Sequence, residues 1–199
     1  MVLMKGDFMK VIIAEDEYIS LMGLKANLEE LGHEVIGEAT DGKDAVKQVL
    51  EKKPDMVIMD INMPIINGID ALRQINEKLS IPSIIVSGYH DQKLVKKANE
   101  VGVYAYLIKP ISKQDIKVAI QTSNSRFLDY KNIEQQLIKT EKKYEDRKYI
   151  ERAKGILMEN HHLREHEAMK KLQKMSRDKN IKMATLAEKI IEANELIQK

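Results

Sequence analysis

The stretch Met56-Val-Ile-Met-Asp60 consists of four apolar residues followed by a carboxylate. Four comparable runs occur in the first 110 residues. They are Val11-Ile-Ile-Ala14, Val35-Ile-Gly-Glu-Ala39, Ser83-Ile-Ile-Val-Ser87 and Tyr104-Ala-Tyr-Leu-Ile108. Runs of this length are too short for helices, and four of the five are dense in β-branched or aromatic residues. They are therefore typical of buried strands.

Amphipathic helical segments lie between these runs. Leu21, Leu24 and Leu28, for example, recur at helical spacing on one face. Alternating strands and helices predict an α/β fold, in which five parallel strands form a doubly wound sheet with helices on both faces. In such a sheet the functional crevice lies at the carboxyl ends of the strands.

Polar residues end or follow four of the five predicted strands. Glu15 and Asp16 follow the first run, and Asp60 ends the third. Ser87 ends the fourth run and Lys109 follows the fifth. Because parallel strands end at one edge of the sheet, three carboxylates, a hydroxyl and an ammonium are expected in one pocket. Each residue alone is common as a turn residue or helix cap, but this combination in this order is specific.

Three carboxylates in one pocket repel one another unless a cation neutralises them. Oxygen ligands suit a hard divalent ion such as Mg²⁺, which retains waters and shares the phosphate oxygens of a substrate. A magnesium ion beside Lys109 would stabilise the charge of a transferring phosphoryl group. A carboxylate such as Asp60 can be the nucleophile that accepts this group. Ser87 can donate a hydrogen bond to a phosphoryl oxygen, and Lys109 can pair with the phosphate or with Asp60.

Four motifs resemble the receiver domain of two-component response regulators, a family with a flavodoxin-like fold. They are Val11-Ile-Ile-Ala-Glu-Asp-Glu17, Asp60-Ile-Asn-Met-Pro-Ile-Ile-Asn-Gly68, Val86-Ser-Gly88 and Tyr106-Leu-Ile-Lys-Pro110, within a match over about residues 10–121. The resemblance implies that a histidine kinase phosphorylates Asp60. It also implies that Asp16, Asp60 and the backbone carbonyl of Asn62 hold magnesium, with Glu15 assisting.

The same resemblance implies a switch that responds to phosphorylation. Ser87 and Tyr106 would be the switch pair, and Lys109 would bind the phosphate. The Lys109–Pro110 peptide bond would be cis. Receivers need a Ser or Thr at the switch position, and Ser87 meets this need.

The character of the sequence changes after Pro110. No Gly or Pro occurs again before Gly155, so the segment 113–148 is expected to form one long helix. Heptad positions carry Ile116, Tyr130, Ile133, Leu137 and Tyr144, with interruptions at Ser123, Arg126, Thr140 and Arg147. This stripe predicts a coiled coil compatible with a dimer. The alternative is a solvated connector helix.

The last 50 residues are helical in pattern and basic in part. Breaks at 160–162 and 178–180 predict a small bundle of three helices. Between Lys148 and Lys182 there are ten basic and five acidic residues, although the whole chain carries a net charge of only +2. This asymmetry favours a polyanionic partner. The alternative is an ordinary solvated helical surface.

The stretch Ile150-Glu-Arg-Ala-Lys-Gly-Ile-Leu-Met158 resembles the start of the ANTAR domain, an RNA-binding module of transcription antiterminators. Further matching positions are Glu165, Glu167-Ala168, Leu172, Ser176-Arg-Asp178, Leu186-Ala187 and Ile190-Ile191. The resemblance implies binding to paired hairpins in nascent RNA, which excludes an overlapping terminator. The expected RNA contacts are Lys148, Arg152, Lys154, Gly155 and Arg177. One departure is His161-His-Leu-Arg164, where the family has a small residue and then a Ser- or Thr-led helix cap.

These observations predict a receiver over 1–121, a coiled-coil linker helix over 122–147 and a three-helix RNA-binding domain over 148–199. Phosphorylation of Asp60 would promote a homodimer that binds RNA hairpins. A DNA-binding transcription factor and a regulator that only dimerises are the alternatives. No enzymatic constellation beyond the receiver's own phosphoryl transfer is visible. The absence of cysteine, of a signal peptide and of any apolar run near 20 residues leads us to expect a cytoplasmic protein without a membrane partner.

Overall fold

A computed structural model describes residues 8–88 and 92–197 of the chain. Residues 1–7 lie outside the described residues, whereas Met9, which we consider a second candidate for the initiating residue, is described and buried. The chain divides into two compact units, Met1–Lys131 and Asn132–Lys199. Each unit is a separate body with its own hydrophobic core.

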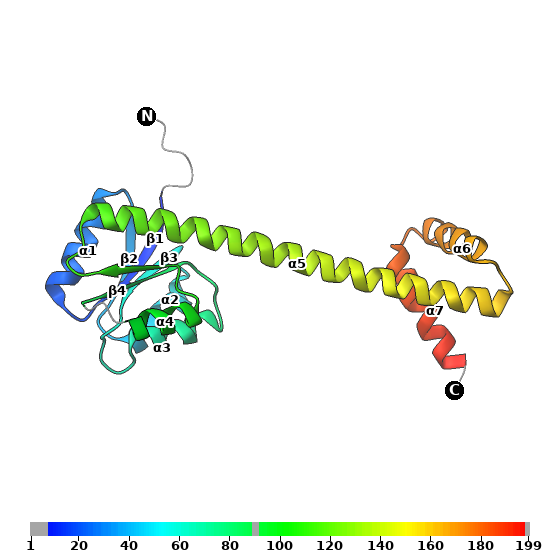
Figure 1. The fold of residues 1–199 in the computed structure, drawn as a ribbon, viewed down its shortest axis with the longest axis horizontal. Helices are drawn as coiled ribbons and strands as arrows, with labels where there is room; N and C mark the ends of the chain where they lie inside the picture. The colour runs from blue at the N-terminus through cyan, green and yellow to red at the C-terminus, as the bar shows by residue number, and fades with distance from the viewer. Residues whose placement is uncertain (1–7, 89–91, 198–199) are drawn as a thin grey trace, which may run out of the picture. The chain divides into compact units, whose positions relative to one another are not determined.

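The first unit is built on a five-stranded parallel sheet (Figure 1). Its strands are β1 (Lys10–Ala14), β2 (Glu34–Ala39), β3 (Met56–Asp60), β4 (Ser83–Ser87) and β5 (Ala105–Ile108). Their order across the sheet is β2-β1-β3-β4-β5. The five apolar runs therefore form the five predicted strands, and the predicted flavodoxin-like α/β fold is confirmed.

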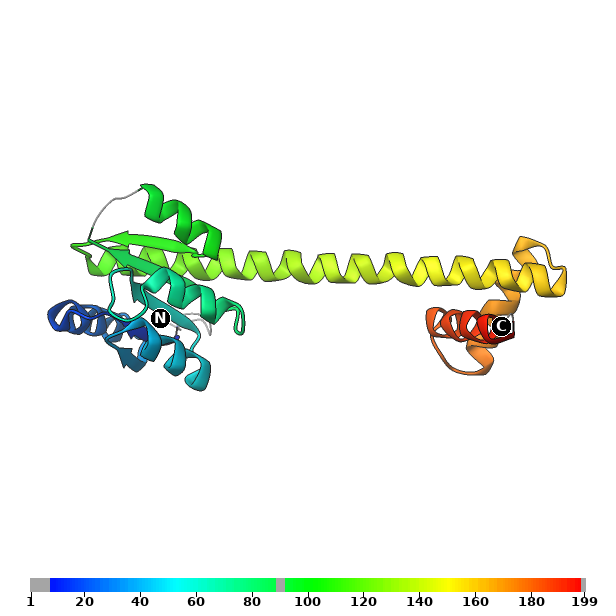
Figure 2. The ribbon, with the colours of Figure 1, turned by 90° about the horizontal axis from the view of Figure 1, so that it is seen from below.

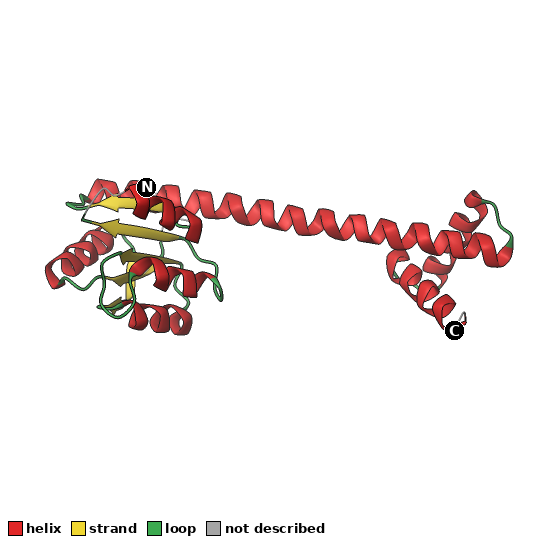
Figure 3. Ribbon diagram, turned by 60° about the horizontal axis from the view of Figure 1, so that its bottom comes forward, coloured by secondary structure: helices red, strands yellow, loops and turns green. Residues whose placement is uncertain are grey.

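Helices cover both faces of this sheet, as Figure 3 shows in red against the yellow strands. Helix α1 (Tyr18–Glu30) and the first part of α5 (Lys113–His161) lie on one face. Helices α2 (Gly42–Lys52), α3 (Gly68–Asn76) and α4 (Gln92–Val101) lie on the other. Successive strand residues alternate between the two cores, so Ile12 packs under α2 and α3 whereas Ile13 packs under α1 and α5.

Helix α5 begins where the sequence predicted but extends further, to His161 rather than to about Lys148. The first output helix is thus continuous with the long helix. Residues 113–161 contain no proline, and their one glycine, Gly155, costs only about 1 kcal/mol in a helix. That cost is too small to end a helix whose last turns pack in the core of the second unit.

The second unit consists of the C-terminal part of α5 with α6 (Glu165–Asp178) and α7 (Met183–Ile197), which lie together in Figure 2. Their shared core is formed by Ala153, Leu157, Ala168, Leu172, Leu186, Ala187 and Ile191. The two predicted breaks occur at residues with a positive φ, His162 at 53° and Asn180 at 50°. Among the described residues, no helix is both long enough and apolar enough to span a membrane.

Candidate functional site

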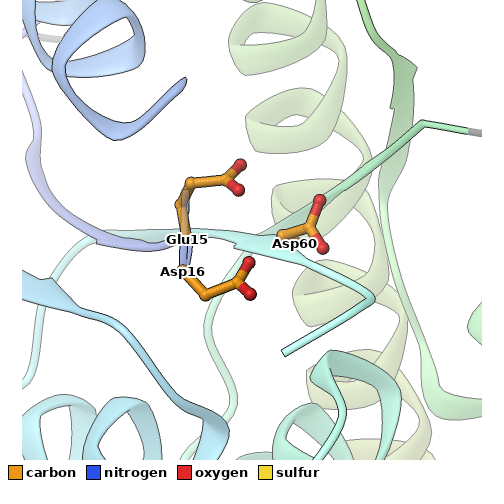
Figure 4. A group of neighbouring side chains, drawn as sticks. All are labelled: Glu15, Asp16 and Asp60. Atoms are coloured by element: carbon orange, nitrogen blue, oxygen red, sulfur yellow. The ribbon is translucent and has the colours of Figure 1, made fainter. Parts of the chain in front are cut away.

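Three carboxylates meet at the carboxyl edge of the sheet (Figure 4). Ala14 of β1 pairs with Met59 of β3, so the residues that follow each, Glu15 and Asp60, lie next to each other. One carboxylate oxygen of Glu15, Asp16 and Asp60 each lies within 4.8 Å of the others. Glu15 and Asp60 are buried, whereas Asp16 is exposed. The neighbouring strands thus bring together the three acids that the sequence placed at their ends.

Lys109 supplies the positive charge of this site. It follows β5, and its backbone N–H donates to the Ser87 carbonyl at 2.9 Å. Its Nζ lies 2.7 Å from Glu15 Oε2 and 3.0 Å from Asp60 Oδ1. The Lys109–Pro110 bond is cis, as the resemblance implied. One ammonium beside three carboxylates leaves a net negative pocket.

Burial and neighbouring charges shift the pKa values of Glu15 and Lys109. Burial raises the pKa of Glu15 and the neighbouring Asp60 raises it further, although the Lys109 hydrogen bond opposes both. Burial alone would lower the pKa of Lys109, but its hydrogen bonds to Glu15 and Asp60 outweigh burial and raise it. The ammonium of Lys109 is therefore secured in its charged form by the carboxylates that it contacts.

The loop after β3 holds the Asp60 side chain from the other side. The Asn62 backbone N–H donates to Asp60 Oδ2 at 2.5 Å, so both carboxylate oxygens of Asp60 are engaged. The loop closes on Gly68, where an added Cβ would lie 2.1 Å from the Asp60 carbonyl oxygen. Only glycine fits this approach. Although Gly68 belongs to the quoted motif, sequence reasoning assigned it no part in the site.

The two residues expected to form the switch lie on neighbouring strands. Ser87 ends β4 and is fully buried. Tyr106 lies in β5, half-buried, and packs against the core on the α2, α3 and α4 side of the sheet. Their backbones belong to one parallel strand pair, in which Ser87 pairs with Ile108 and Ile85 with Tyr106.

The chemistry of the pocket fits a divalent cation. Its donors are carboxylate oxygens, which are the ligands that magnesium prefers. Two of the three acids already contact Lys109, whereas exposed Asp16 has no hydrogen-bond or ion-pair partner among the described residues. The structure therefore offers oxygen ligands, uncompensated negative charge and access from solvent at one place.

In the second unit, two of the residues expected to contact RNA form ion pairs between helices. Arg152 on α5 lies 2.8 Å from Glu195 on α7. Lys154 on α5 lies 2.5 Å from Glu151 and 2.7 Å from Glu165 on α6, and only 12% of its side chain is exposed. Hydrogen bonds to these two acids raise the pKa of Lys154. The pairs to Glu195 and Glu165 were not predicted from the sequence because these partners lie on other helices, 43 and 11 residues along the chain.

The other three expected RNA contacts remain open to solvent in different degrees. Lys148 and Arg177 are exposed. An added Cβ at Gly155 would meet nothing within 4 Å, so no close approach within the chain requires glycine there. Lys148 and Arg152 line one hollow of about 350 Å³ with Tyr144 and Tyr149.

Comparisons with known proteins agree with both units. The response regulator receiver domain matches residues 11–121, and the ANTAR domain matches residues 139–191. The transcriptional regulatory protein PdtaR of Mycobacterium tuberculosis is 39% identical over 183 residues, which cover 92% of this chain and 89% of that protein.

Solved structures resemble the first unit. A DNA-binding response regulator of the LuxR family from Staphylococcus aureus is 32% identical with a TM-score of 0.55, over 58% of this chain and 98% of that one. The CheX–CheY–BeF3–Mg²⁺ complex from Borrelia burgdorferi is 26% identical with a TM-score of 0.54, over 56% of this chain and 85% of that one. The chain belongs to the response regulators of two-component signalling that join a receiver domain to an ANTAR domain.

Proposed function

We propose that Asp60 accepts a phosphoryl group from a histidine kinase. The observation that carries this proposal is the convergence of Asp60 with Glu15, Asp16 and Lys109 at the carboxyl edge of the sheet. A carboxylate oxygen of Asp60 attacks the phosphorus of a phosphohistidine, and a P–O bond forms as the P–N bond breaks. The imidazole nitrogen keeps the electron pair and takes a proton from water. Lys109 stabilises the charge on the transferring group.

The acids of the pocket would hold magnesium for this reaction. Asp16, Asp60 and the backbone carbonyl of Asn62 would be its ligands, with Glu15 assisting. Bound there, magnesium would supply charge stabilisation to the phosphoryl oxygens. The pocket's cluster of carboxylates supports this assignment. The related CheY complex from Borrelia burgdorferi, which contains Mg²⁺ and BeF3, also supports it.

Phosphorylation would act through residues that link the pocket to the rest of the receiver. Ser87 would donate a hydrogen bond to a phosphoryl oxygen, and Tyr106 would change its position in response. Such a switch biases two existing states of the receiver. The proximity of Ser87 to the pocket is supported by the Lys109 N–H bond to its carbonyl.

The output would be RNA binding by a dimer. The exposed apolar residues Tyr130, Ile133, Leu137 and Tyr144 of α5 support pairing with a second copy. Two ANTAR units would then bind two hairpins of one nascent transcript and prevent terminator formation. Linking two sites raises the effective concentration without any new contact, so dimerisation by itself switches affinity. We expect this activity in the cytoplasm.

The phosphorylation step is tested with the full chain, magnesium and acetyl phosphate, a small phosphoryl donor. Intact mass measurement should show one added phosphoryl group on the wild type and none on Asp60→Asn. Asp129→Asn, which changes an exposed carboxylate on α5, is the matched control and should be labelled like the wild type. Labelling of Asp60→Asn at the wild-type level would refute the assignment.

The output is tested by binding of the phosphorylated chain to an RNA with two tandem stem–loops and randomised loops. A duplex DNA of equal length is the competitor at matched salt, because electrostatic affinity depends on salt. Preferential binding of RNA supports the proposal. Preference for DNA would favour a DNA-binding regulator, and binding of neither at low salt would favour a regulator that only dimerises.

A further inference from the structure

Helix α6 carries three cations on one face. Lys170, Lys174 and Arg177 follow one another at spacings of four and three residues, which places them within about 60° of one another around the helix. All three are exposed. Ala168 and Leu172, which are fully buried in the core of the second unit, lie roughly opposite them. The cationic face is therefore the outer face of α6.

The cations of this face have no acidic partner within the part of the chain that the structure describes. No ion pair joins Lys170, Lys174 or Arg177 to a carboxylate, and only Arg177 makes a hydrogen bond, through Nε to the Gln173 carbonyl at 3.4 Å. The acids of α6 lie at its ends. Glu165 pairs with Lys154, and Glu167 accepts a hydrogen bond from the Arg164 backbone N–H.

Two groups of basic residues in the second unit therefore differ in their partners. Arg152 and Lys154 connect α5 to α7 and to α6, and each already pairs with a carboxylate within the chain. Lys170 and Lys174, four residues apart, form no ion pair among the described residues, and like charges at this spacing destabilise an isolated helix. The charge of this face is therefore available to a polyanion.

We propose that this face of α6, formed by Lys170, Lys174 and Arg177, contacts the phosphate backbone of RNA. It rests on the proposed function and names the surface that performs it. The face extends over about 10 Å at 1.5 Å per residue. This length suits a ligand whose charges lie a few ångströms apart. Arg152 and Lys154 position the helices that present the face, and they do not themselves bind phosphate.

The test replaces the three cations by glutamine, which keeps high helix propensity. The variant Lys170→Gln/Lys174→Gln/Arg177→Gln is compared with Lys139→Gln/Lys142→Gln/Lys143→Gln. The control removes the same charge from exposed positions of α5 in the same unit. Both are full chains, phosphorylated as above, and circular dichroism and sedimentation check that folding and oligomeric state match the wild type.

Fluorescence anisotropy measures binding to the tandem stem–loop RNA over a series of KCl concentrations. The α6 variant should lose at least about tenfold in affinity, and its slope of log K against log salt should fall by about 2 to 3, because each lost phosphate contact removes about 0.7 to 0.9 from the slope. The loss should be similar for RNAs with different loops, since phosphate contacts carry no sequence information. The control should stay within about threefold of the wild type.

Two results would overturn this surface while leaving RNA binding intact. One is an α6 variant that binds RNA with wild-type affinity and salt slope. The other is an equal loss in both variants, which would mean that only total charge matters. A wild type that binds no RNA in this assay would instead remove the proposed function, and this surface with it.

Discussion

The three acids of the pocket differ in what surrounds them. Glu15 is buried and paired with Lys109, and Asp60 is buried between Lys109 and the Asn62 N–H. Asp16 is exposed and forms no hydrogen bond or ion pair within the part of the chain that the structure describes. Burial with two contacts fixes the orientation of Asp60, which suits an acceptor. Exposure leaves Asp16 available to a cation that arrives from solvent with its own waters.

Asp16→Asn should therefore weaken magnesium binding more than it weakens folding. Loss of a carboxylate ligand should lower magnesium affinity by at least about tenfold, the range seen when even indirect partners of a metal site are removed. Isothermal titration calorimetry with MgCl2 measures the affinity, with Asp129→Asn as control. Unchanged affinity in Asp16→Asn would show that Asp16 is not a ligand.

Ile65 in the loop after β3 is a strained residue. Its φ is 67°, a region that is unfavourable for a β-branched side chain, and its side chain is 74% exposed. Ile65→Asn should raise the free energy of unfolding by about 1 kcal/mol, because asparagine tolerates this conformation. Urea denaturation measures the change. Ile19→Asn, at an 80% exposed position within α1, should give no such gain, and an equal gain in both variants would rule out relief of strain.

At the scale of elements, the strands and the pocket were predictable because both depend on local order in the sequence. A strand buried on both faces is a short apolar run, and β3 and β4 are buried at every residue. The pocket follows from the polar residue at the end of each run. Nothing beyond the parallel order of the strands was needed to bring Asp60 and Lys109 together.

The second unit was less predictable from the sequence, because its interhelical ion pairs join residues on different helices. Lys154 contacts Glu165 across a turn, and Arg152 contacts Glu195 on another helix. Charge and motif alone cannot separate a lysine that holds two helices together from one that faces solvent. The end of α5 was also placed too early, since a lone Gly155 is tolerated where packing favours the helix.

Helix α6 begins without a side-chain cap because its N-cap residue is Arg164. The Arg164 N–H donates to Glu167, but Arg164 has no acceptor to offer in return. Arg164→Ser should complete the reciprocal cap and stabilise the second unit by about 0.5–1 kcal/mol. Thermal unfolding measures the gain. Arg164→Gln removes the same charge without supplying a short hydroxyl cap, so equal stabilisation by both variants would exclude capping as the cause.

At the scale of the whole molecule, α5 serves both units with different residues. Ile116 and Ser123 occupy heptad positions but are buried in the first unit, where Ser123 Oγ donates to the Ser83 carbonyl at 3.4 Å. These positions belong to the receiver core. The stripe that can pair with a second copy therefore begins near Tyr130 and continues through Ile133 and Leu137. In the proposed dimer, a seam that starts where the receiver core ends on α5 would let the state of the receiver control pairing.

Neighbouring residues of α5 allow a sharp test of this seam. Leu137 and Ile138 are 57% and 58% exposed, but only Leu137 lies on the heptad stripe. Leu137→Lys should weaken the proposed phosphorylated dimer by about two to four orders of magnitude, because a symmetric seam loses two buried leucines at about 1.5–3 kcal/mol each. Ile138→Lys adds the same charge next to the stripe and should leave the dimer nearly unchanged.

Analytical ultracentrifugation with acetyl phosphate measures both variants. Equal dissociation would show that charge on α5, and not a coiled coil, controls association, whereas no dissociation in Leu137→Lys would place the dimer interface elsewhere.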